Sequence, residues 1–291
     1  MDFAQYLEER RTLVNNFLVE RMSVAGISQV DEAMKYSLLA GGKRLRPLLV
    51  MAAADAVGGK GEELLSVACG LEMIHTYSLI HDDLPVMDND DYRRGRLTNH
   101  KVYGDAVALL AGDGLLTLAF EVMLEQTNVD PAVLVKVVRE MAACAGNKGM
   151  VGGQTLDLAA EGKTLSLQEM EAVHEAKTGA LFIAAVCGGG QLGGATTEQL
   201  QALKHFAELF GLAFQITDDI LDVVGNAEEM GKATGSDSKL QKATYVSLYS
   251  LEKAQQIAAD TLKEAMSTLD IFGEKAEPLR CMTQMLYNRK N

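Results

Sequence analysis

The chain has 291 residues, a formal net charge of −13 and an apolar content of 48%. Such an acidic chain repels nucleic acid and anionic membranes, so an anionic ligand would need local clusters of cations to hold it. The apolar content suffices for a large core, while the four prolines, the lack of tryptophan and the absence of sustained strand alternation favour helices. We therefore expect one all-α domain over residues 1–291, folded as a helical bundle.

Two further classes of protein are disfavoured. The four cysteines show no CxxC or Cys–His spacing, so we expect reduced thiols and no zinc site. No charged and apolar leader of the secretory kind opens the chain. The longest apolar run, residues 106–123, contains Asp113 and Glu121 and is expected to be a core helix. We expect a cytoplasmic protein with no stable membrane anchor and no nucleic-acid partner.

The first helices lead to a basic turn. An amphipathic helix is predicted over residues 2–22, and Asp31 is a candidate cap for a second helix that ends at residues 41–42. The turn GGKRLRP, residues 41–47, places Lys43, Arg44 and Arg46 just before a helix predicted at 48–57. Cationic side chains and open backbone amides at a helix start suit an anion, although a solvated basic turn is the alternative.

The next helix, predicted over residues 71–80, runs into an unusually acidic segment. Residues 75–96 read HTYSLIHDDLPVMDNDDYRRGR, with five aspartates followed at once by three arginines. Pro85 should break or kink the helix. Carboxylates this close repel one another and usually persist because a cation lies among them. Mg²⁺ fits, because it takes one or two carboxylates and completes its shell with phosphate oxygens and water; a solvated helix cap is the alternative.

Residues 94–104 are expected to form a polar loop. Helices are predicted at 105–126, from Asp130 to about residue 146, and after the glycine-rich segment GMVGGQTLDL at 149–158. Ser166 and Glu169 form a capping-box pattern. The helix that they open is interrupted by Lys177, Thr178 and a glycine. A buried lysine needs a partner, so this break suggests a ligand group, with an exposed lysine at a simple kink as the alternative.

A second acidic helix end favours the functional interpretation of both. The helix predicted at 198–224 carries FQITDDILDVVG, in which Gln215, Asp218, Asp219 and Asp222 share one face. The following loop, residues 225–242, contains glycines and the lysines Lys232 and Lys242, and suits a lid over phosphate. Helices at about 245–270 and 275–288 complete the chain.

Two facing aspartate clusters could hold Mg²⁺ ions that bind a substrate diphosphate and activate it as a leaving group. The sequence contains no Walker A loop and no nucleophile paired with a base. Cleavage of a C–O bond to leave a carbocation therefore fits better than phosphoryl transfer. The cation requires a dry cavity, and the candidate lining residues are Tyr77, Leu79, Ala106, Leu110, Phe182 and Phe214.

The motifs GGKRLRP, HDDLPVMDNDDYRRGR, GGQTLD, KTGAL, FQITDDILD and GKATGSDSKLQKATY occur in this order over nearly the whole chain. Together they make the chain similar to the all-trans short-chain prenyl diphosphate synthases, and within that family most like bacterial farnesyl diphosphate synthases. The resemblance implies a homodimer of helical bundles, each around an apolar cavity. It also implies ionisation, condensation and elimination, with about three Mg²⁺ ions bridged by the substrate diphosphate.

The resemblance further implies roles for matching residues. Magnesium would be bound by Asp82, Asp83, Asp88 and Asp218, with Asp219 and Asp222 more peripheral. The allylic diphosphate would be held by Arg93, Lys177, Lys232 and Lys242. Isopentenyl diphosphate would be held by Lys43, Arg46, His75 and Arg94. Thr178 and Gln215 would place oxygens near the developing cation, and the released diphosphate would take the proton.

Product length follows from helix geometry. Tyr77 precedes Asp82 by five residues, which is about 7.5 Å along a helix, so its ring should close the cavity behind a fifteen-carbon chain. A geranylgeranyl diphosphate synthase stays open as an alternative, because the acidic motif resembles those of plant enzymes too. A terpene cyclase would not need Lys43, Arg46 and Arg94 for a second substrate. A catalytically silent partner subunit is the non-enzyme alternative, and the two complete aspartate clusters argue against it.

Overall fold

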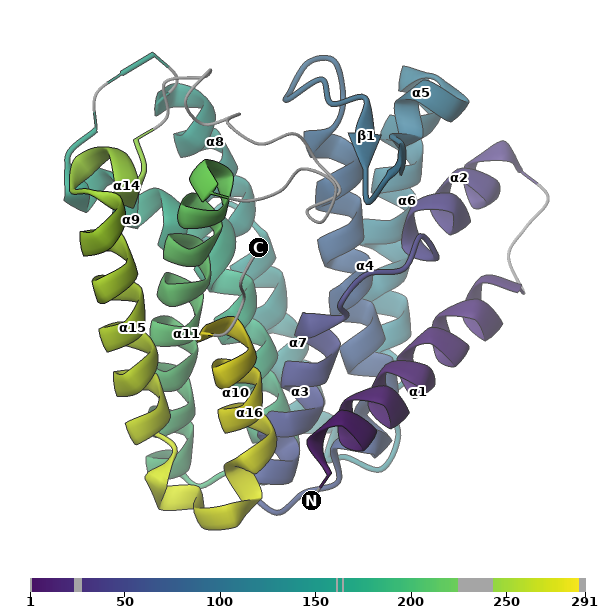
Figure 1. Cartoon of the computed structure of the whole chain (residues 1–291). Coiled ribbons are helices and arrows are strands. Elements are labelled where there is room, and N and C mark those ends of the chain that lie inside the picture. The colour runs from purple at the N-terminus through teal and green to yellow at the C-terminus, as the bar shows by residue number, and fades with distance from the viewer. Residues whose placement is uncertain (1, 24–27, 161, 164, 225–242, 288–291) are drawn as a thin grey trace.

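The computed structural model describes residues 2–23, 28–160, 162–163, 165–224 and 243–287, and most of them lie in helices packed side by side (Figure 1). The first half contains α1 (Phe3–Ser23), α2 (Gln29–Leu38), α3 (Leu45–Ala56), α4 (Leu65–Asp82), α5 (Asn99–Tyr103), α6 (Asp105–Leu124) and α7 (Pro131–Ala145). The second half contains α8 (Met150–Ala160), α9 (Leu167–His174), α10 (Ala180–Leu192), α11 (Thr197–Val224), α14 (Tyr245–Leu248), α15 (Leu251–Ser267) and α16 (Glu277–Tyr287). The expected all-α fold is confirmed.

Short elements connect these helices. The 3₁₀ segments are η1 (Gly61–Leu64) and η3 (Asp270–Ala276), and the π-helical turn η2 (Glu175–Gly179) joins α9 to α10 without a break. Strands β1 (Tyr92–Arg93) and β2 (Arg96–Leu97) pair antiparallel as a small hairpin. A π turn inserts an extra residue into a helix and often marks a functional site. The predicted interruption at Lys177 is therefore confirmed as a local change of helix type.

Several predicted boundaries were wrong for local reasons. Ser28 is the N-cap of α2, and Asp31 accepts hydrogen bonds from the Ser28 amide and hydroxyl, so Asp31 lies inside the helix. The supposed loop at residues 94–104 contains β2 and α5. The predicted helix at 245–270 is two helices, because Thr244 caps α14 and Ser250 then caps α15. The predicted lid, residues 225–242, lies outside the described residues.

The main core runs through α1 to α7, α10, part of α11 and the C-terminal helices, and a second, smaller cluster lies where α9, α11, α14 and α15 meet. The extension of one domain over residues 1–291 stays a prediction. The carboxyl ends of α4 and α11, which carry the two aspartate clusters, lie at the same end of the bundle (Figure 1). The fold therefore brings together two acidic segments that are far apart in sequence.

Helix α6 is apolar on both sides but buried on one. It packs mainly on α4 and also on α2, α5 and α7. Leu109 is 47% exposed and Leu110 is 52% exposed, while Ala106 also faces outward. Within the described ranges α6 is the one helix long and apolar enough to cross a membrane, a test that core helices also meet, and 39% of its apolar window is buried. The expected core helix is thus only half buried, and Ala106 and Leu110, which were predicted to line a cavity, are exposed instead.

Glycines allow α10 to lie directly on α3. A Cβ at Gly189 would stand 2.1 Å from the carbonyl oxygen of Val50, which is backbone and cannot move aside cheaply. At the neighbouring Gly188 a Cβ would meet the terminal methyl of Met141 at 2.5 Å, and that flexible side chain can rotate away. The close approach of the two helices thus depends on Gly189 more than on its neighbour.

We expect Gly189→Ala to lower the free energy of unfolding by about 2–4 kcal/mol, because overpacking against backbone outweighs the better helix propensity of alanine. The matched substitution Gly188→Ala should change it by less than about 1 kcal/mol. Urea unfolding followed by circular dichroism measures both. Equal losses in the two variants would contradict this account of the α3–α10 contact.

Candidate active site

The first aspartate cluster forms where α4 ends. The chain turns back after Asp82, and the amide of Asp88 donates to the carbonyl oxygen of Asp82 at 2.9 Å. Pro85 lies within this turn, so the helix ends before it as predicted. The turn places Asp88 beside Asp82 although six positions separate them.

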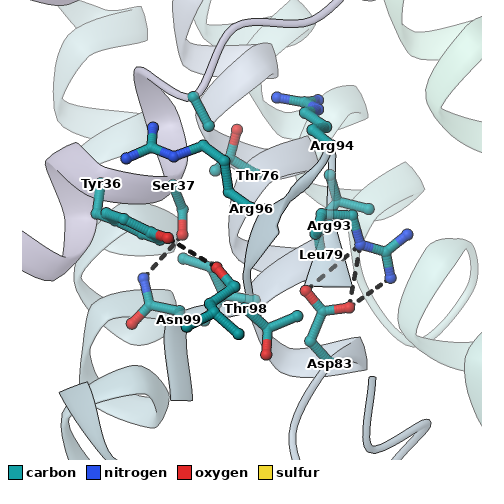
Figure 2. A pocket seen from close by; sticks show the side chains of 13 residues that line it. Tyr36, Ser37, Thr76, Leu79, Asp83, Arg93, Arg94, Arg96, Thr98 and Asn99 are labelled. Carbon is teal, nitrogen blue, oxygen red and sulfur yellow. Dashed lines mark hydrogen bonds and ion pairs between the residues drawn. The ribbon is translucent and has the colours of Figure 1, made fainter. Parts of the chain in front are cut away.

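Asp82 and Asp83 point in different directions, because successive helical residues are rotated by about 100°. Asp82 lines a cavity, whereas Asp83 is 3% exposed and accepts from the guanidinium of Arg93, with Nε at 3.0 Å from Oδ1 and Nη2 also in contact. Figure 2 shows Arg93 directed at the Asp83 carboxylate and Arg94 directed away from it. The hairpin is thus anchored to the end of α4 through this ion pair.

The charge of Asp82 is costly in this environment. Burial raises the pKa of Asp82 to about 6, and the carboxylates of Asp88 and Asp83 add to the rise, while Lys177 and Arg93 oppose it. A divalent cation between Asp82 and Asp88 would remove this penalty. The oxygen-only donor set suits Mg²⁺. Within the described ranges no group of three or more acidic, histidine or cysteine side chains is arranged so that it could hold a metal ion.

A cavity of about 330 Å³ extends from Asp82 along α4. Its apolar wall includes Tyr77, Leu79, Met87, Met150, Val151 and Leu158. Tyr77 and Leu79 were predicted to line it, and α8 supplies a wall that the sequence did not indicate. Phe182 and Phe214 instead pack on each other in the core, with ring centroids 5.1 Å apart.

The ring of Tyr77 is supported by His81. Its ring packs edge-on to His81 at 5.6 Å, and Nε2 of His81 lies 2.9 Å from the carbonyl oxygen of Leu109 on α6. Gly112 leaves room for the His81 ring, because a Cβ there would approach Nε2 to 2.1 Å. Tyr77 is 5% exposed, and burial raises its pKa to about 12, with a further contribution from Asp82. A neutral, well-supported ring therefore lines this part of the cavity.

The π turn supplies two polar groups to the cavity. Nζ of Lys177 donates to Asp157 of α8 at 2.6 Å, and Oγ1 of Thr178 donates to Oε1 of Gln215 at 3.2 Å. Gln154, also in the lining, buries both amide atoms without a hydrogen bond inside the described part of the chain. Gln154 and Asp157 are three residues apart on α8 and therefore share a face, and this spacing is the signal from which their part in the site could have been predicted.

The second aspartate cluster lies behind Thr178. Asp219 is 3% exposed, and its two oxygens accept from Nε2 of Gln215 at 3.1 Å and from the amide of Tyr245 at 2.9 Å. Asp218 lies within electrostatic reach of Arg46, whose pKa it tends to raise. Asp222 is also buried. The structure therefore places Asp218 near Arg46, a cation that lines the same cavity as Asp82.

The basic turn contributes its cations unequally. Arg44 has a left-handed backbone (φ 51°) and is 3% exposed; it pairs with Glu72 at 2.8 Å and donates to the carbonyl oxygen of Leu38. This arginine holds the turn in place and was not recognised as structural from the sequence. Lys43, one position earlier, is exposed. The guanidinium of Arg46 lies 4.9 Å over the ring of Phe182.

Arg46, His75 and Arg94 gather at the inner end of this turn. Burial lowers the pKa of Arg46 to about 10. Burial, followed by the nearby charges of Arg46 and Arg94, holds the pKa of His75 well below its usual range, so this imidazole is neutral at pH 7. Arg94 donates to the carbonyl oxygen of Gly41 and packs against Gly42. Three of the four residues expected to bind isopentenyl diphosphate thus lie together. Of the residues expected to bind the allylic diphosphate, Lys232 and Lys242 lie outside the described residues.

Comparison with known proteins agrees with this geometry. The polyprenyl synthetase family pattern matches residues 27–278. A farnesyl diphosphate synthase of Geobacillus stearothermophilus is 48% identical over 270 residues, covering 91% of this chain and 90% of that protein. A chloroplastic geranylgeranyl pyrophosphate synthase of Capsicum annuum is 46% identical over 293 residues, covering 100% of this chain and 79% of that protein.

The crystal structure of an FPP/GFPP synthase from Zymomonas mobilis superposes with a TM-score of 0.87 at 38% identity, covering 98% of this chain and 99% of that one. The match extends over both aspartate clusters, the basic turn and the π turn. The chain therefore belongs to the polyprenyl synthetase family and is a prenyltransferase of its short-chain, all-trans branch.

Proposed function

We propose that this prenyltransferase condenses isopentenyl diphosphate with dimethylallyl and geranyl diphosphate and releases farnesyl diphosphate. The observation that carries this product is Tyr77, a buried and braced ring in the wall of a cavity that begins at Asp82. Relatives are named both as farnesyl and as geranylgeranyl diphosphate synthases, so we base the choice between the two products on this ring. Geranylgeranyl diphosphate is the alternative product.

Two sets of cations suit two diphosphates. We assign the allylic diphosphate to Arg93 and Lys177, both within electrostatic reach of Asp82, together with Lys232 and Lys242. Lys177 is paired with Asp157 in the structure, so an arriving diphosphate would compete for an ammonium that is already oriented. We assign isopentenyl diphosphate to the group formed by Lys43, Arg46, His75 and Arg94.

The residues around the reacting carbon are suited to a carbocation. The hydroxyl of Thr178 and the amide of Gln215 are linked at 3.2 Å, which orients their oxygen dipoles beside the cavity. The apolar wall excludes water that would trap the cation. Because His75 is neutral and faces the cation-rich end, we assign it a binding role, and the proton lost at the end of the reaction goes to the released diphosphate.

Magnesium fits the acidic groups, and when bound it neutralises the diphosphate as a leaving group. Asp82, Asp88 and Asp218 are the carboxylates that we expect to hold about three ions together with phosphate oxygens. Asp83 and Asp219 have oxygens engaged by Arg93 and by Gln215 and Tyr245, so their first effect is to orient neighbouring groups. Asp222, three residues after Asp219 on α11, completes the set.

The decisive experiment incubates purified protein with isopentenyl diphosphate, Mg²⁺ and either dimethylallyl or geranyl diphosphate, and measures product chain length. Farnesyl diphosphate from both donors supports the proposal. Geranylgeranyl diphosphate as the main product would replace it by the alternative. Conversion of the donor without isopentenyl diphosphate would indicate a cyclase, and no turnover with any donor would indicate a silent subunit.

Replacing Tyr77 by alanine should lengthen the product to twenty carbons or more, because the ring that blocks the chain is removed while Asp82 and the cations stay in place. Tyr77→Phe keeps the ring and should keep the fifteen-carbon product. Chromatography of the dephosphorylated products measures both. A product unchanged in Tyr77→Ala would show that another side chain sets the length.

Asp82→Asn should stabilise the metal-free protein while removing activity. The folded-state pKa of Asp82, about 6, is above its ordinary value of 3.8, so the ionised carboxylate costs stability above pH 6 and costs nothing once protonated below about pH 4. We therefore expect a gain of roughly 1–3 kcal/mol at pH 8 in the presence of EDTA, which shrinks as the pH falls toward 5.

Thermal unfolding across this pH range tests the prediction, with exposed Asp270→Asn as the matched control. Prenyltransfer by Asp82→Asn should fall at least about a hundredfold. A variant that is destabilised at pH 8 without metal would show that the carboxylate has a structural partner instead.

We also propose that two copies associate through the exposed face of α6, formed by Ala106, Leu109, Leu110 and Leu124 with Val102 of α5. Most of these residues gather at the start of α6, while the exposed Asp113, Thr117 and Glu121 separate them from Leu124. An exposed apolar patch of this kind often marks an interface. The net charge of −13 disfavours an anionic membrane surface as the occupant, in keeping with a cytoplasmic protein.

Leu110→Glu should convert the dimer to a monomer, because it buries a carboxylate in an apolar interface. Sedimentation velocity measures the mass. Val19→Glu, at a comparably exposed apolar position of α1, should leave the dimer intact. A wild-type protein that sediments as a monomer would contradict the proposed interface.

A further inference from the structure

Behind the cavity, a continuous line of hydrogen bonds joins the π turn to the second aspartate cluster and returns to α9. Thr178 donates to Gln215, and Gln215 donates to Oδ1 of Asp219 at 3.1 Å. The amide of Tyr245 donates to Oδ2 of Asp219 at 2.9 Å, and the hydroxyl of Tyr245 donates to Oε1 of Glu171 at 2.7 Å. Since α9 continues directly into η2, the line closes on itself.

The line is buried at its centre. Tyr245 is 2% exposed and Asp219 is 3% exposed. Burial and the hydrogen bond to Glu171 both raise the pKa of Tyr245, so its hydroxyl stays protonated and remains the donor. Hydrogen bonds to charged groups in such surroundings are among the stronger ones in proteins. The arrangement therefore fixes the relative positions of α9, η2, α11 and the start of α14.

Among the residues that the structure describes, Tyr245 is the one that links the aspartate cluster to Glu171. Its backbone reaches the aspartate cluster while its side chain reaches Glu171, which precedes Thr178 by seven residues. Its ring also packs beside His174 at 6.2 Å and stacks on Tyr249 at 6.4 Å. A shift of Tyr245 would be transmitted to Asp219, and through Gln215 to Thr178.

We propose that Tyr245, held by Glu171, is a positioning residue for the metal and diphosphate site. It keeps Asp219 oriented, and through Asp219 it keeps the end of α11, with Asp218 and Asp222, in register with Lys177 and Thr178. This role rests on the proposed reaction, since it is the allylic diphosphate and its metal ions that meet these groups. Isopentenyl diphosphate is assigned to the basic turn, and none of the residues to which we assign it takes part in the hydrogen bonds from Thr178 to Glu171.

The test compares Tyr245→Phe, Glu171→Ala and the conservative Glu171→Gln, which keeps an acceptor oxygen. Removing the hydroxyl or its acceptor should raise both the Mg²⁺ concentration for half-maximal rate and the KM for geranyl diphosphate by about five- to tenfold. The KM for isopentenyl diphosphate should change less than twofold. Glu171→Gln should recover most of the loss. Tyr249→Phe, an exposed tyrosine four positions on, is the matched control and should behave as wild type.

A binding measurement separates this inference from the proposed reaction. Calorimetry with Mg²⁺ and inorganic pyrophosphate should show weaker binding in Tyr245→Phe and Glu171→Ala by a similar factor. The double variant should be no weaker than either single one, because the two groups act through one hydrogen bond. If the wild-type protein forms no prenyl product, the proposed reaction is wrong. The pyrophosphate binding constants still test whether Tyr245 positions the site.

Unchanged pyrophosphate binding in both single variants would show that Tyr245 only fills the small core beneath α15, and the proposal would be overturned. An equal rise in KM for both substrates with a lowered melting temperature would overturn it as well, because that pattern reports general loosening. Should Tyr245→Phe not fold, the pair Glu171→Ala and Glu171→Gln decides alone.

Discussion

Asp82 ends α4 beside two other carboxylates, and burial with their repulsion raises its pKa to about 6. Neighbouring cationic groups partly offset this concentration of negative charge. Asp83 is turned toward Arg93, Lys177 is held by Asp157 within reach of Asp82, and the turn after the helix brings Asp88 back beside it. Without a cation the cluster costs stability, and we propose that bound cations make it the site for a diphosphate.

The cations that surround this cluster are positioned by groups that make no contact with the cavity. Arg44 is buried against Glu72 and fixes the turn from which Arg46 enters the cavity. A buried pair of this kind contributes little net stability compared with apolar residues, yet leaving either partner alone costs several kcal/mol. Its value here lies in a rigid basic turn. The left-handed backbone of Arg44 is maintained by the three hydrogen bonds of its side chain.

On the opposite side of the cavity, too, some residues reach the cavity and others hold them in place. Thr178 and Lys177 reach the cavity from a π turn, and Glu171, Tyr245 and Asp219 form the support behind them. We assign the control of product length to a third side of the cavity, where the ring of Tyr77 packs on His81 and Nε2 of His81 lies close to a main-chain carbonyl oxygen of α6. Helix α6 thereby connects the wall of the cavity to the apolar face that we assign to a second copy.

Local pattern was sufficient for most of the helices, for the end of α4 before Pro85, for the interruption at Lys177 and for the family. Each depends on neighbouring residues or on motifs that can be recognised directly in the sequence. Only the tertiary structure separated Asp82, which faces the cavity, from Asp83, which faces Arg93, and Arg46 from the structural Arg44. It also showed that Ala106 and Leu110 face outward and that Tyr245 meets Glu171 across 74 positions. Direction and partner are set by packing between distant segments, and such contacts leave no periodic trace in one sequence.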